Sequence, residues 1–390
     1  MDAPSPDTGR WVPRGILLPV VLVALIVAAQ VGFGFGTASG SQDPDATGQS
    51  IRIDCDRGQS IGQALTASRP GATITVRGTC QEAVTVTTDG LTLDGDGVAV
   101  LDGGNAGVAL TIDGARGVTI RGFTVQNGSR GIDVLNVATL SLEDTLVRGN
   151  RSHGVEITNA SVDADNVTSH GNGRAGLIVN RNSLLNVTDS TFEDNLTGLV
   201  LYSNANTRLT GTNRMIANAT QGLTVGLGAV AFSLGSTIVT EDNGEEGTLL
   251  LQDGGLQLIG GRLEVAGNGL DGVRVDQVSS LTIGITEFGV SGEAIIAGNG
   301  GNGITVSDGS NLVVSEIMPV TSQANTGAGL FVDASDVSVD GSRFDNNDGA
   351  GIQLSFGTKA TLEGNTVDTM TCDDTVLSRG TTTCPQPPAT

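Results

Sequence analysis

Asn150-Arg151-Ser152-His153-Gly154-Val155-Glu156-Ile157 is one copy of a pattern that recurs from residue 127 to residue 354. In each copy an asparagine stands four residues before a glycine, and a short alternation of aliphatic and variable residues follows. Successive glycines are 22 to 31 residues apart. At Gly198 the glycine is kept and Asp194 takes the asparagine's place. The full pairs are Asn127 and Gly131, Asn150 and Gly154, Asn172 and Gly176, Asn218 and Gly222, Asn243 and Gly247, Asn268 and Gly272, Asn299 and Gly303, Asn325 and Gly329, and Asn347 and Gly351.

A period of this length is typical of a solenoid, in which a single repeat cannot bury its own apolar face. The residues after each glycine alternate with the period of a strand, as in Val155-Glu156-Ile157, so the two aliphatic side chains face the core. Two further apolar runs fill each period. We therefore expect three short strands per turn and turns stacked about 4.8 Å apart. We also expect the asparagines to stack in a hydrogen-bonded ladder, and the glycines to occupy a turn position with positive φ.

This pattern resembles the right-handed parallel β-helix, or pectin-lyase-like, superfamily over roughly residues 50–370. The start of the domain adds to the resemblance, because Gln59–Leu65 is typical of a short capping helix with Ser60 and Gln63 as a capping box. The expected fold class is all-β: a single-stranded right-handed parallel β-helix of about 11–12 rungs with a short N-terminal capping helix. The right hand is implied by the resemblance. The superfamily includes lyases, hydrolases, epimerases, adhesins and inert scaffolds, so the fold does not fix the function.

The charge balance excludes one class of function. The 390-residue chain has a net charge of −22 and a single lysine, Lys359, whereas a nucleic-acid surface needs a basic stripe. An acidic surface suits solubility, cation binding or a cationic partner.

The N-terminus indicates export. Residues 15–31 carry no charge and follow Arg10 and Arg14, a pattern typical of an export signal. We expect residues 1–35 to be a cleaved signal peptide or, by preference, an uncleaved transmembrane anchor. Residues 36–50 would be a flexible tether, 51–370 the β-helix, and 371–390 a C-terminal cap and tail. The β-helix would then be extracytoplasmic, held at the membrane, or secreted or periplasmic after cleavage.

Four cysteines lie at the two ends of the repeat region. Cys55 and Cys80 flank the predicted capping helix, and Cys372 and Cys384 lie at the far end. Three pairings are possible, and we favour the two local disulfides. Zinc is disfavoured because neither pair has C-x-x-C spacing, and no metal ligands are assigned. Calcium remains open as a cofactor, with Asp345–Gly349 as the oxygen-rich stretch.

His153 precedes Gly154 as the histidine does in polygalacturonases, but the equivalent positions on the two earlier rungs are Arg130 and Ala106. Both aspartates of that family are missing, and glycoside hydrolysis needs two carboxylates. The polygalacturonase mechanism is therefore rejected, and His153 and His170 are interpreted as solvated turn residues.

Two other surfaces remain as candidates. Glu246 and Asp271 directly precede the glycines of successive rungs, so they should lie about 5 Å apart as a catalytic carboxylate pair, with Arg274 as a binding residue beside them. The long rung after Gly272 could provide a wall there, from residues 288–293. The second surface is a binding face with four outward residues, Asp133, Glu156, Asn180 and Tyr202.

We expect an exported, non-catalytic scaffold that binds polysaccharide or another envelope component along one face. The first alternative is a polysaccharide lyase or glycoside hydrolase that uses Glu246 and Asp271. The second is a purely structural spacer. The sequence favours a non-catalytic protein, because its asparagine ladder is regular and no complete set of catalytic residues is recognised.

Overall fold

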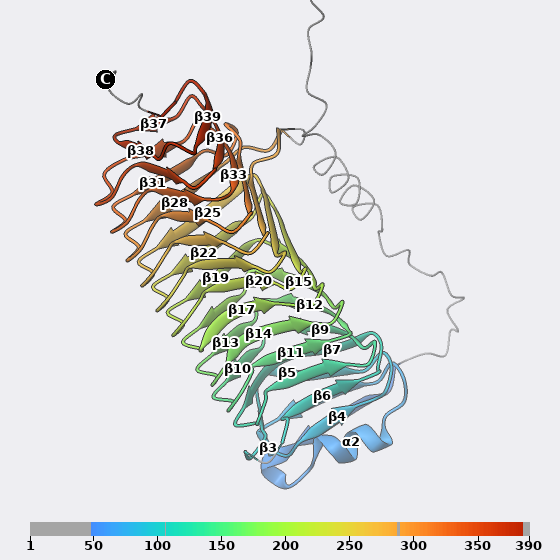
Figure 1. Ribbon diagram of the computed structural model, residues 1–390. Helices are drawn as coiled ribbons and strands as arrows, with labels where there is room; N and C mark the ends of the chain where they lie inside the picture. Colours follow the sequence, from blue (N-terminus) through green and yellow to red (C-terminus); the bar gives the residue numbers. More distant parts are fainter. Residues whose placement is uncertain (1–47, 106, 287–288, 385–390) are drawn as a thin grey trace, which may run out of the picture. The chain divides into compact units, whose positions relative to one another are not determined.

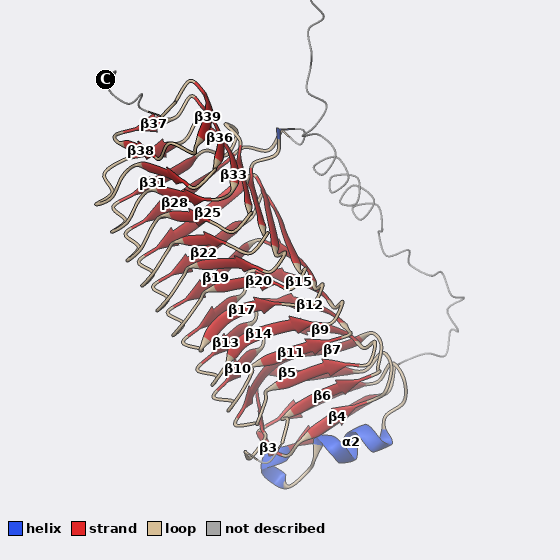
Figure 2. Ribbon diagram, in the orientation of Figure 1, coloured by secondary structure: helices blue, strands red, loops and turns tan. Residues whose placement is uncertain are grey.

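Parallel strand pairing repeats along the described part of the chain. The computed structural model describes residues 48–105, 107–286 and 289–384. Within them the strands form two parallel sheets of 13 and 26 strands, which we call sheet B and sheet A. Each full turn contributes one strand to sheet B and two to sheet A (Figure 2). The predicted parallel β-helix is confirmed.

The strands of sheet B are β4 (Val84–Val86), β6 (Leu110–Asp113), β8 (Ile132–Leu135), β11 (Val155–Thr158), β14 (Ala175–Asn180), β17 (Thr197–Leu201), β20 (Leu223–Gly226), β23 (Thr248–Leu251), β26 (Val273–Val275), β29 (Ile304–Val306), β32 (Leu330–Asp333), β35 (Ile352–Ser355) and β38 (Met370–Cys372). Ten of these strands, β8 to β35, begin next to a repeat glycine. Sheet B is longer than the 11–12 rungs expected because β4, β6 and β38 continue it without the asparagine–glycine signature.

The strands of sheet A are β1 (Ser50–Asp54), β2 (Thr73–Arg77), β3 (Thr79–Gln81), β5 (Thr92–Asp102), β7 (Val118–Gln126), β9 (Thr139–Glu143), β10 (Leu146–Arg148), β12 (Ser161–Asp165), β13 (Thr168–His170), β15 (Leu184–Thr188), β16 (Thr191–Glu193), β18 (Asn206–Thr210), β19 (Thr212–Ile216), β21 (Val230–Leu234), β22 (Thr237–Glu241), β24 (Gly255–Ile259), β25 (Gly261–Ala266), β27 (Ser280–Ile283), β28 (Gly292–Ala297), β30 (Asn311–Val314), β31 (Val320–Gln323), β33 (Asp336–Asp340), β34 (Arg343–Phe344), β36 (Lys359–Glu363), β37 (Thr366–Val367) and β39 (Leu377–Gly380).

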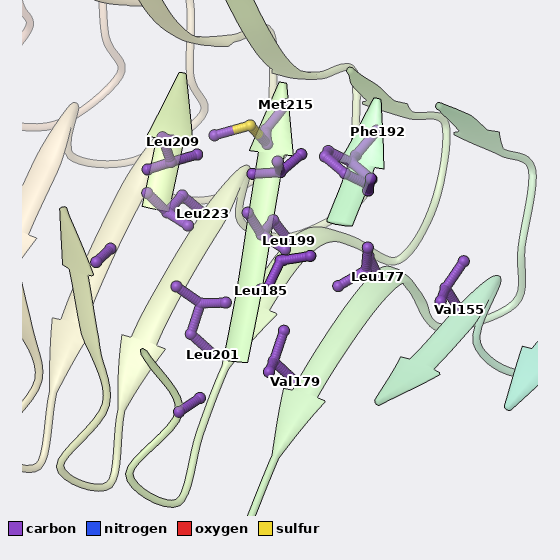
Figure 3. Packing of buried hydrophobic residues seen from close by; sticks show 14 of the residues in the cluster. Val155, Leu177, Val179, Leu185, Phe192, Leu199, Leu201, Leu209, Met215 and Leu223 are labelled. Atoms are coloured by element: carbon purple, nitrogen blue, oxygen red, sulfur yellow. The ribbon is translucent and has the colours of Figure 1, made fainter. Parts of the chain in front are cut away.

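Aliphatic side chains fill the space between the sheets. Val155, Leu177, Leu199 and Leu223 occupy the same register position on β11, β14, β17 and β20, and all four are fully buried. Figure 3 shows these side chains stacked in one row, with Phe192 and Met215 packed beside them from sheet A. Such rows form one continuous hydrophobic core along the stack. Each turn therefore needs the turns on either side to bury its apolar side chains.

The predicted asparagine ladder is present, with a correction to its membership. Each side-chain oxygen accepts from the side-chain nitrogen of the preceding rung, as Asn172 does from Asn150 at 2.9 Å. Asn195, and not Asp194, continues the ladder on the Gly198 rung, where it accepts from Asn172 at 3.0 Å. Asn127 stands outside it and donates to Asp102. The members are Asn150, Asn172, Asn195, Asn218, Asn243, Asn268, Asn299, Asn325 and Asn347.

The expectation of positive φ at the repeat glycines is wrong. Gly176 and its equivalents do not have positive φ, and the left-handed conformation falls instead on the residue just before each ladder asparagine, such as Asp194 at φ 54°. The glycine is required for space. A Cβ on Gly176 would lie 2.7 Å from Nδ2 of Asn195 on the next rung.

A disulfide lies at each end of the described stack. Cys55 pairs with Cys80 and Cys372 with Cys384, which confirms the two local disulfides. At the N-terminal end a short 3-10 turn, η1 (Cys55–Arg57), leads into helix α2 (Ile61–Ala67), which lies against β4 (Figure 1).

The capping box of α2 is present in part. The hydroxyl of Ser60 accepts from the backbone N–H of Gln63 as predicted. Glu82, in the bend between β3 and β4, accepts from the backbone N–H groups of Ile61 and Gly62 and from the Ser60 hydroxyl. A long-range carboxylate therefore caps the helix in addition to the local box.

The predicted signal or anchor segment and most of the tether lie in residues 1–47, outside the described residues. Among the residues that the structure does describe, no helix is both long enough and apolar enough to cross a membrane.

Candidate functional site

A hollow of about 600 Å³ opens on the outer face of sheet B across β8, β11 and β14. Its lining includes Arg130, Asp133, Glu156, Thr158, Asn180 and Arg181. The hollow therefore coincides with the predicted binding face, and three of that face's four residues, Asp133, Glu156 and Asn180, line it.

Strand register brings these side chains together. Asp133 pairs with Glu156, and Leu135 with Thr158, which in turn pairs with Asn180. Side chains two residues apart on a strand point to the same face, so two outward rows run side by side along the stack. The sequence repeat alone was sufficient to predict these rows.

Arg130 joins the two carboxylates of the hollow. Its Nη2 lies 3.2 Å from Oδ2 of Asp133, and its Nη1 lies 2.7 Å from Oε2 of Glu156. Arg130 precedes Gly131 at the corner before β8, three residues from Asp133. In the sequence, Arg130 marks only the place of a missing aspartate, and it was not predicted to be a binding residue. The i, i+3 spacing to Asp133 was the available signal.

Asp133 is the most unusual group in the hollow. Its side chain is 8% exposed, and its Oδ1 atom is buried without a hydrogen-bond partner. Burial raises the pKa of Asp133 to about 6, an effect that Arg130 opposes and Glu156 reinforces. An unpartnered buried oxygen is destabilising by about 1–3 kcal/mol unless a ligand or water supplies the missing donor. Asp133 Oδ1 therefore has acceptor capacity that no described residue uses, and it belongs to a residue that lines the hollow.

Arg181 supplies a different kind of charge at the rim. It is exposed, adopts φ 54° in the turn after β14, and makes no ion pair within the described residues. The hollow thus offers carboxylate acceptors, an amide at Asn180, a hydroxyl at Thr158 and an unpaired guanidinium. This is a mixture of donors and acceptors that suits a ligand with many hydroxyl groups.

Tyr202, the fourth predicted binding residue, lies beside the hollow. It follows β17, its backbone N–H donates to Val179 O at 2.9 Å, and the next residue, Ser203, lines the hollow. Tyr202 is half-buried, and burial raises the pKa of its hydroxyl.

Neither histidine is the solvated turn residue that was expected. His153 is half-buried, and its Nδ1 accepts from the backbone N–H of Ala175 at 3.3 Å. Burial lowers the pKa of His153, so the neutral ring serves this contact between rungs. His170 is half-buried at the end of β13. His170 is in register with Arg148 and Glu193 of the neighbouring rungs, so it belongs to a strand and not to a turn.

Glu246 and Asp271 do occupy successive rungs at one corner, because Gly222 N–H donates to Glu246 O and Gly247 N–H to Asp271 O. Their side chains are bonded within the scaffold, however. Glu246 Oε2 accepts from Gln221 Nε2 at 3.0 Å, and Asp271 Oδ1 accepts from the backbone N–H of Asn302 at 2.7 Å.

The long rung does not supply the wall that was expected beside this pair. Residues 289–291 lie at the corner before β28, whereas Glu246 and Asp271 lie at the corner before sheet B. The extra segment packs within its own corner, where Gly261 N–H donates to Ser291 O. Residues 287–288 lie outside the described residues.

Arg274 takes part in a second charged cluster. Its Nη2 lies 3.2 Å from Oδ2 of Asp276, and its Nη1 lies 3.9 Å from Oδ2 of Asp271. Asp276 and Asp308 share a side-chain hydrogen bond, which raises the pKa of Asp308. Burial would raise the pKa of Asp276, but its bonds to Asp308 and Arg274 outweigh burial and lower it.

Part of the stretch proposed for calcium is engaged in other contacts, while Asp345 Oδ1 is buried without a hydrogen-bond partner among the described residues. Asp345 is ion-paired with Arg343, which lowers the pKa of Asp345, and Asn347 belongs to the ladder. In the described ranges the one group of three metal-type side chains is Cys55, Cys80 and Glu82. Its two sulfurs form a disulfide and cannot ligate a metal as thiolates.

The fold and its repeat define a class of protein, and the comparison of families assigns this chain to it. The family described as "Right handed beta helix region" matches residues 106–263 and 261–383. The chain belongs to this family, and the right hand of the helix follows from that membership.

Solved structures with similar folds are distant in sequence. The periplasmic alginate epimerase AlgG is 13% identical, with 84% of this chain and 82% of that chain covered and a TM-score of 0.46. The A-module of mannuronan C-5 epimerase AlgE6 from Azotobacter vinelandii is 15% identical, with 82% and 93% covered and a TM-score of 0.40. The pectate lyase Pel9A is 14% identical, with 85% and 78% covered and a TM-score of 0.33. A search of curated proteins found no match.

Proposed function

We propose that this protein is an extracytoplasmic β-helix scaffold that binds a saccharide in the hollow on sheet B. The observation that carries the proposal is the buried Oδ1 atom of Asp133, which has no partner in the described structure. A ligand hydroxyl would complete that hydrogen bond. Sugars are rich in hydroxyl groups, and the amide of Asn180 and the guanidinium of Arg181 offer donors around the same space.

The extracytoplasmic location rests on the two disulfides and the export signal. Disulfides persist in oxidising compartments and are rare in the cytosol of most cells. The uncharged N-terminal segment supports the same location and provides either a membrane anchor or a cleaved leader. The saccharide could then belong to the cell envelope or to the surroundings.

Binding can be tested with polygalacturonate, alginate, xylan and a neutral β-glucan, by affinity electrophoresis of the full chain. We expect retention by at least one polymer. Asp133→Ala and Asn180→Ala should each weaken that retention about tenfold, because each removes a bond in the hollow. Asn186→Ala is the matched control, since Asn186 is an exposed asparagine on sheet A. Equal loss in all three variants, or no retention of the unmodified protein, would contradict the proposal.

A second candidate function is acid–base chemistry on a bound saccharide. Two observations favour it: the pKa of Asp133 at about 6, and the second carboxylate, Glu156, one rung away. A carboxyl group with a pKa near neutrality can donate a proton to a glycosidic oxygen. The same incubations would then yield new reducing or unsaturated ends, and Asp133→Asn would abolish them. Loss of products in Glu246→Gln or Asp271→Asn, but not in Asp133→Asn, would instead favour the other carboxylate pair.

A purely structural spacer is the third candidate. This candidate requires that no polysaccharide retains the protein and that no reaction products are found. Substitutions in the hollow would then alter only the stability of the protein.

A further inference from the structure

Seven asparagines of the chain begin the sequence Asn-x-Ser/Thr, in which the middle residue is not proline. This sequence is the acceptor for N-linked glycans in exported proteins. All seven lie between residues 127 and 220, and no ladder asparagine from Asn243 onward has a serine or threonine two residues later. The acceptor sequence is therefore not a constant part of the repeat. It occurs at Asn127, Asn150, Asn159, Asn166, Asn186, Asn195 and Asn218.

Burial excludes three of the seven acceptors. Asn150, Asn195 and Asn218 belong to the ladder and are at most 3% exposed. Both Nδ2 hydrogens of Asn218 are used, in bonds to Phe192 O and Asn243 Oδ1. A glycan on such an amide would have to pass through the packed corner of the stack, so the folded chain has no room for it.

Two further acceptors have their polar groups engaged. Asn127 is half-buried, and its Nδ2 donates to Asp102. Asn186 is exposed on β15, but its Nδ2 and the hydroxyl group of Thr188 are both hydrogen-bonded to neighbouring rungs. A glycosyl-transferring enzyme would have to break contacts of the sheet to reach Asn186.

Asn159 and Asn166 differ from the other five. They lie at the corners on either side of β12, adopt φ angles of 51° and 52°, and are exposed. Nδ2 of Asn159 makes no hydrogen bond among the described residues, and Nδ2 of Asn166 uses one of its two hydrogens, in a 2.7 Å bond to Asp144. The hydroxyl groups of Ser161 and Thr168, which complete the two acceptor sequences, are half-exposed and form no bond within the described part of the chain. Both groups that define an acceptor are therefore accessible at each corner.

We propose that Asn159 and Asn166 carry N-linked glycans. This inference rests on the extracytoplasmic location in the proposed function, but not on saccharide binding in the hollow. The donor is an oligosaccharide linked to a lipid phosphate in the membrane that the chain crosses. The bond from Nδ2 to C1 of the first sugar forms, the C1–O bond to the phosphate breaks, and its electron pair leaves with the lipid phosphate. Nδ2 gives up one proton and keeps its second hydrogen, so Asn166 retains a donor for Asp144.

The test uses the protein purified from the cells that naturally produce it, digested without reduction and analysed by mass spectrometry. We expect hexose or N-acetylhexosamine mass increments on Asn159 and Asn166, and none on the three buried ladder asparagines. The same digest shows whether Cys55 is linked to Cys80 and Cys372 to Cys384. These disulfides report passage through an oxidising compartment independently of any glycan.

Substitutions of the hydroxyl residue test each site without removing its asparagine. Ser161→Ala should abolish the increment on Asn159, whereas the matched control Ser161→Thr keeps the acceptor sequence and should keep the increment. Thr168→Ala and Thr168→Ser form the same pair for Asn166. Each variant is produced in the source cells, and its thermal midpoint shows whether the fold is retained.

The outcomes separate this inference from the proposed location. Unmodified Asn159 and Asn166, or glycans confined to other asparagines, would overturn the inference, while intact disulfides in the same digest would leave the extracytoplasmic location standing. Free thiols at all four cysteines would contradict the location, and this inference with it.

Discussion

Gly176 lies directly beneath the ladder amide of Asn195, at a distance where a Cβ on Gly176 would come within 2.7 Å of Nδ2. The same contact recurs between each repeat glycine from Gly131 to Gly329 and the ladder asparagine of the next rung. The two halves of the sequence signature are thus coupled across rungs, because the asparagine of one turn requires the glycine of the turn before it.

Gly176→Ala should therefore destabilise the protein by about 1–3 kcal/mol, since a close-packed contact is overfilled. Chemical denaturation measures the change. Gly107→Ala is the control, because a Cβ there meets no atom within 4 Å. The double mutant Gly176→Ala with Asn195→Ala should show coupling between the two sites. Additive effects would mean that the glycine serves another purpose.

Asn195→Ala should lower the free energy of unfolding by about 1–3 kcal/mol, because it leaves the buried backbone N–H of Asn172 without its acceptor and removes one acceptor of Asn172 Nδ2. The neighbouring change Asp194→Asn should have little effect, since asparagine tolerates the left-handed conformation at residue 194. Unfolding midpoints of the two variants decide the assignment. A larger loss at residue 194 would restore the membership first expected from spacing.

Asp133→Asn tests the buried carboxyl group through pH. A pKa raised to about 6 in the folded state means that the native protein holds this proton more tightly than the unfolded chain. The stability that protonated Asp133 contributes is therefore fully present below the ordinary pKa of 3.8. It is lost as the pH rises through about 6. The neutral amide of the variant resembles the protonated carboxyl group. The variant should therefore be more stable than the unmodified protein by about 2–3 kcal/mol at pH 7.5 and similar to it at pH 3.5.

Unfolding of both proteins across pH 3.5 to about 8 is the measurement. Asp253→Asn is the control, because Asp253 is exposed in a turn and already adopts positive φ. A variant with the same pH dependence as the unmodified protein would mean that Asp133 ionises freely in the fold.

Glu82→Ala should destabilise the N-terminal cap by about 1–3 kcal/mol, because two backbone N–H groups of α2 and the Ser60 hydroxyl lose their acceptor. Hydrogen exchange at Ile61 and Gly62 should rise more than exchange in the central strands. Glu363→Ala, at an exposed position on β36, is the comparison. Unchanged protection at α2 would show that the Ser60 box alone caps the helix.

Repeat spacing was sufficient to predict the fold, the phase of the strands and the rows of outward residues. An alternation with a period of two, inside a repeat of about 22 to 25 residues, specifies which side chains stack. It therefore predicts that Asp133, Glu156 and Asn180 share one face. The local disulfides followed from the position of the cysteines at the two ends.

The ladder assignment at residue 194 was wrong for a physical reason. Counting back from the glycine assumes a constant turn length, but the Gly198 rung has one residue fewer between its asparagine and its glycine. Hydrogen bonding to Asn172 and Asn218 selects Asn195. The steric role of the repeat glycine could not be predicted either, because the contact is with the next rung and cannot be inferred from a single repeat.

The sequence by itself determined a stacked, aliphatic-cored β-helix with acidic surface charge, because periodic burial of apolar side chains is a local property of the chain. Only the tertiary structure decided how each acidic group is hydrogen-bonded. Glu246 and Asp271 are bonded within the scaffold by Gln221 and Asn302, while Asp133 keeps an unpartnered oxygen in a hollow. That difference depends on side chains from neighbouring rungs, whose distances and hydrogen bonds exist only once the turns are stacked.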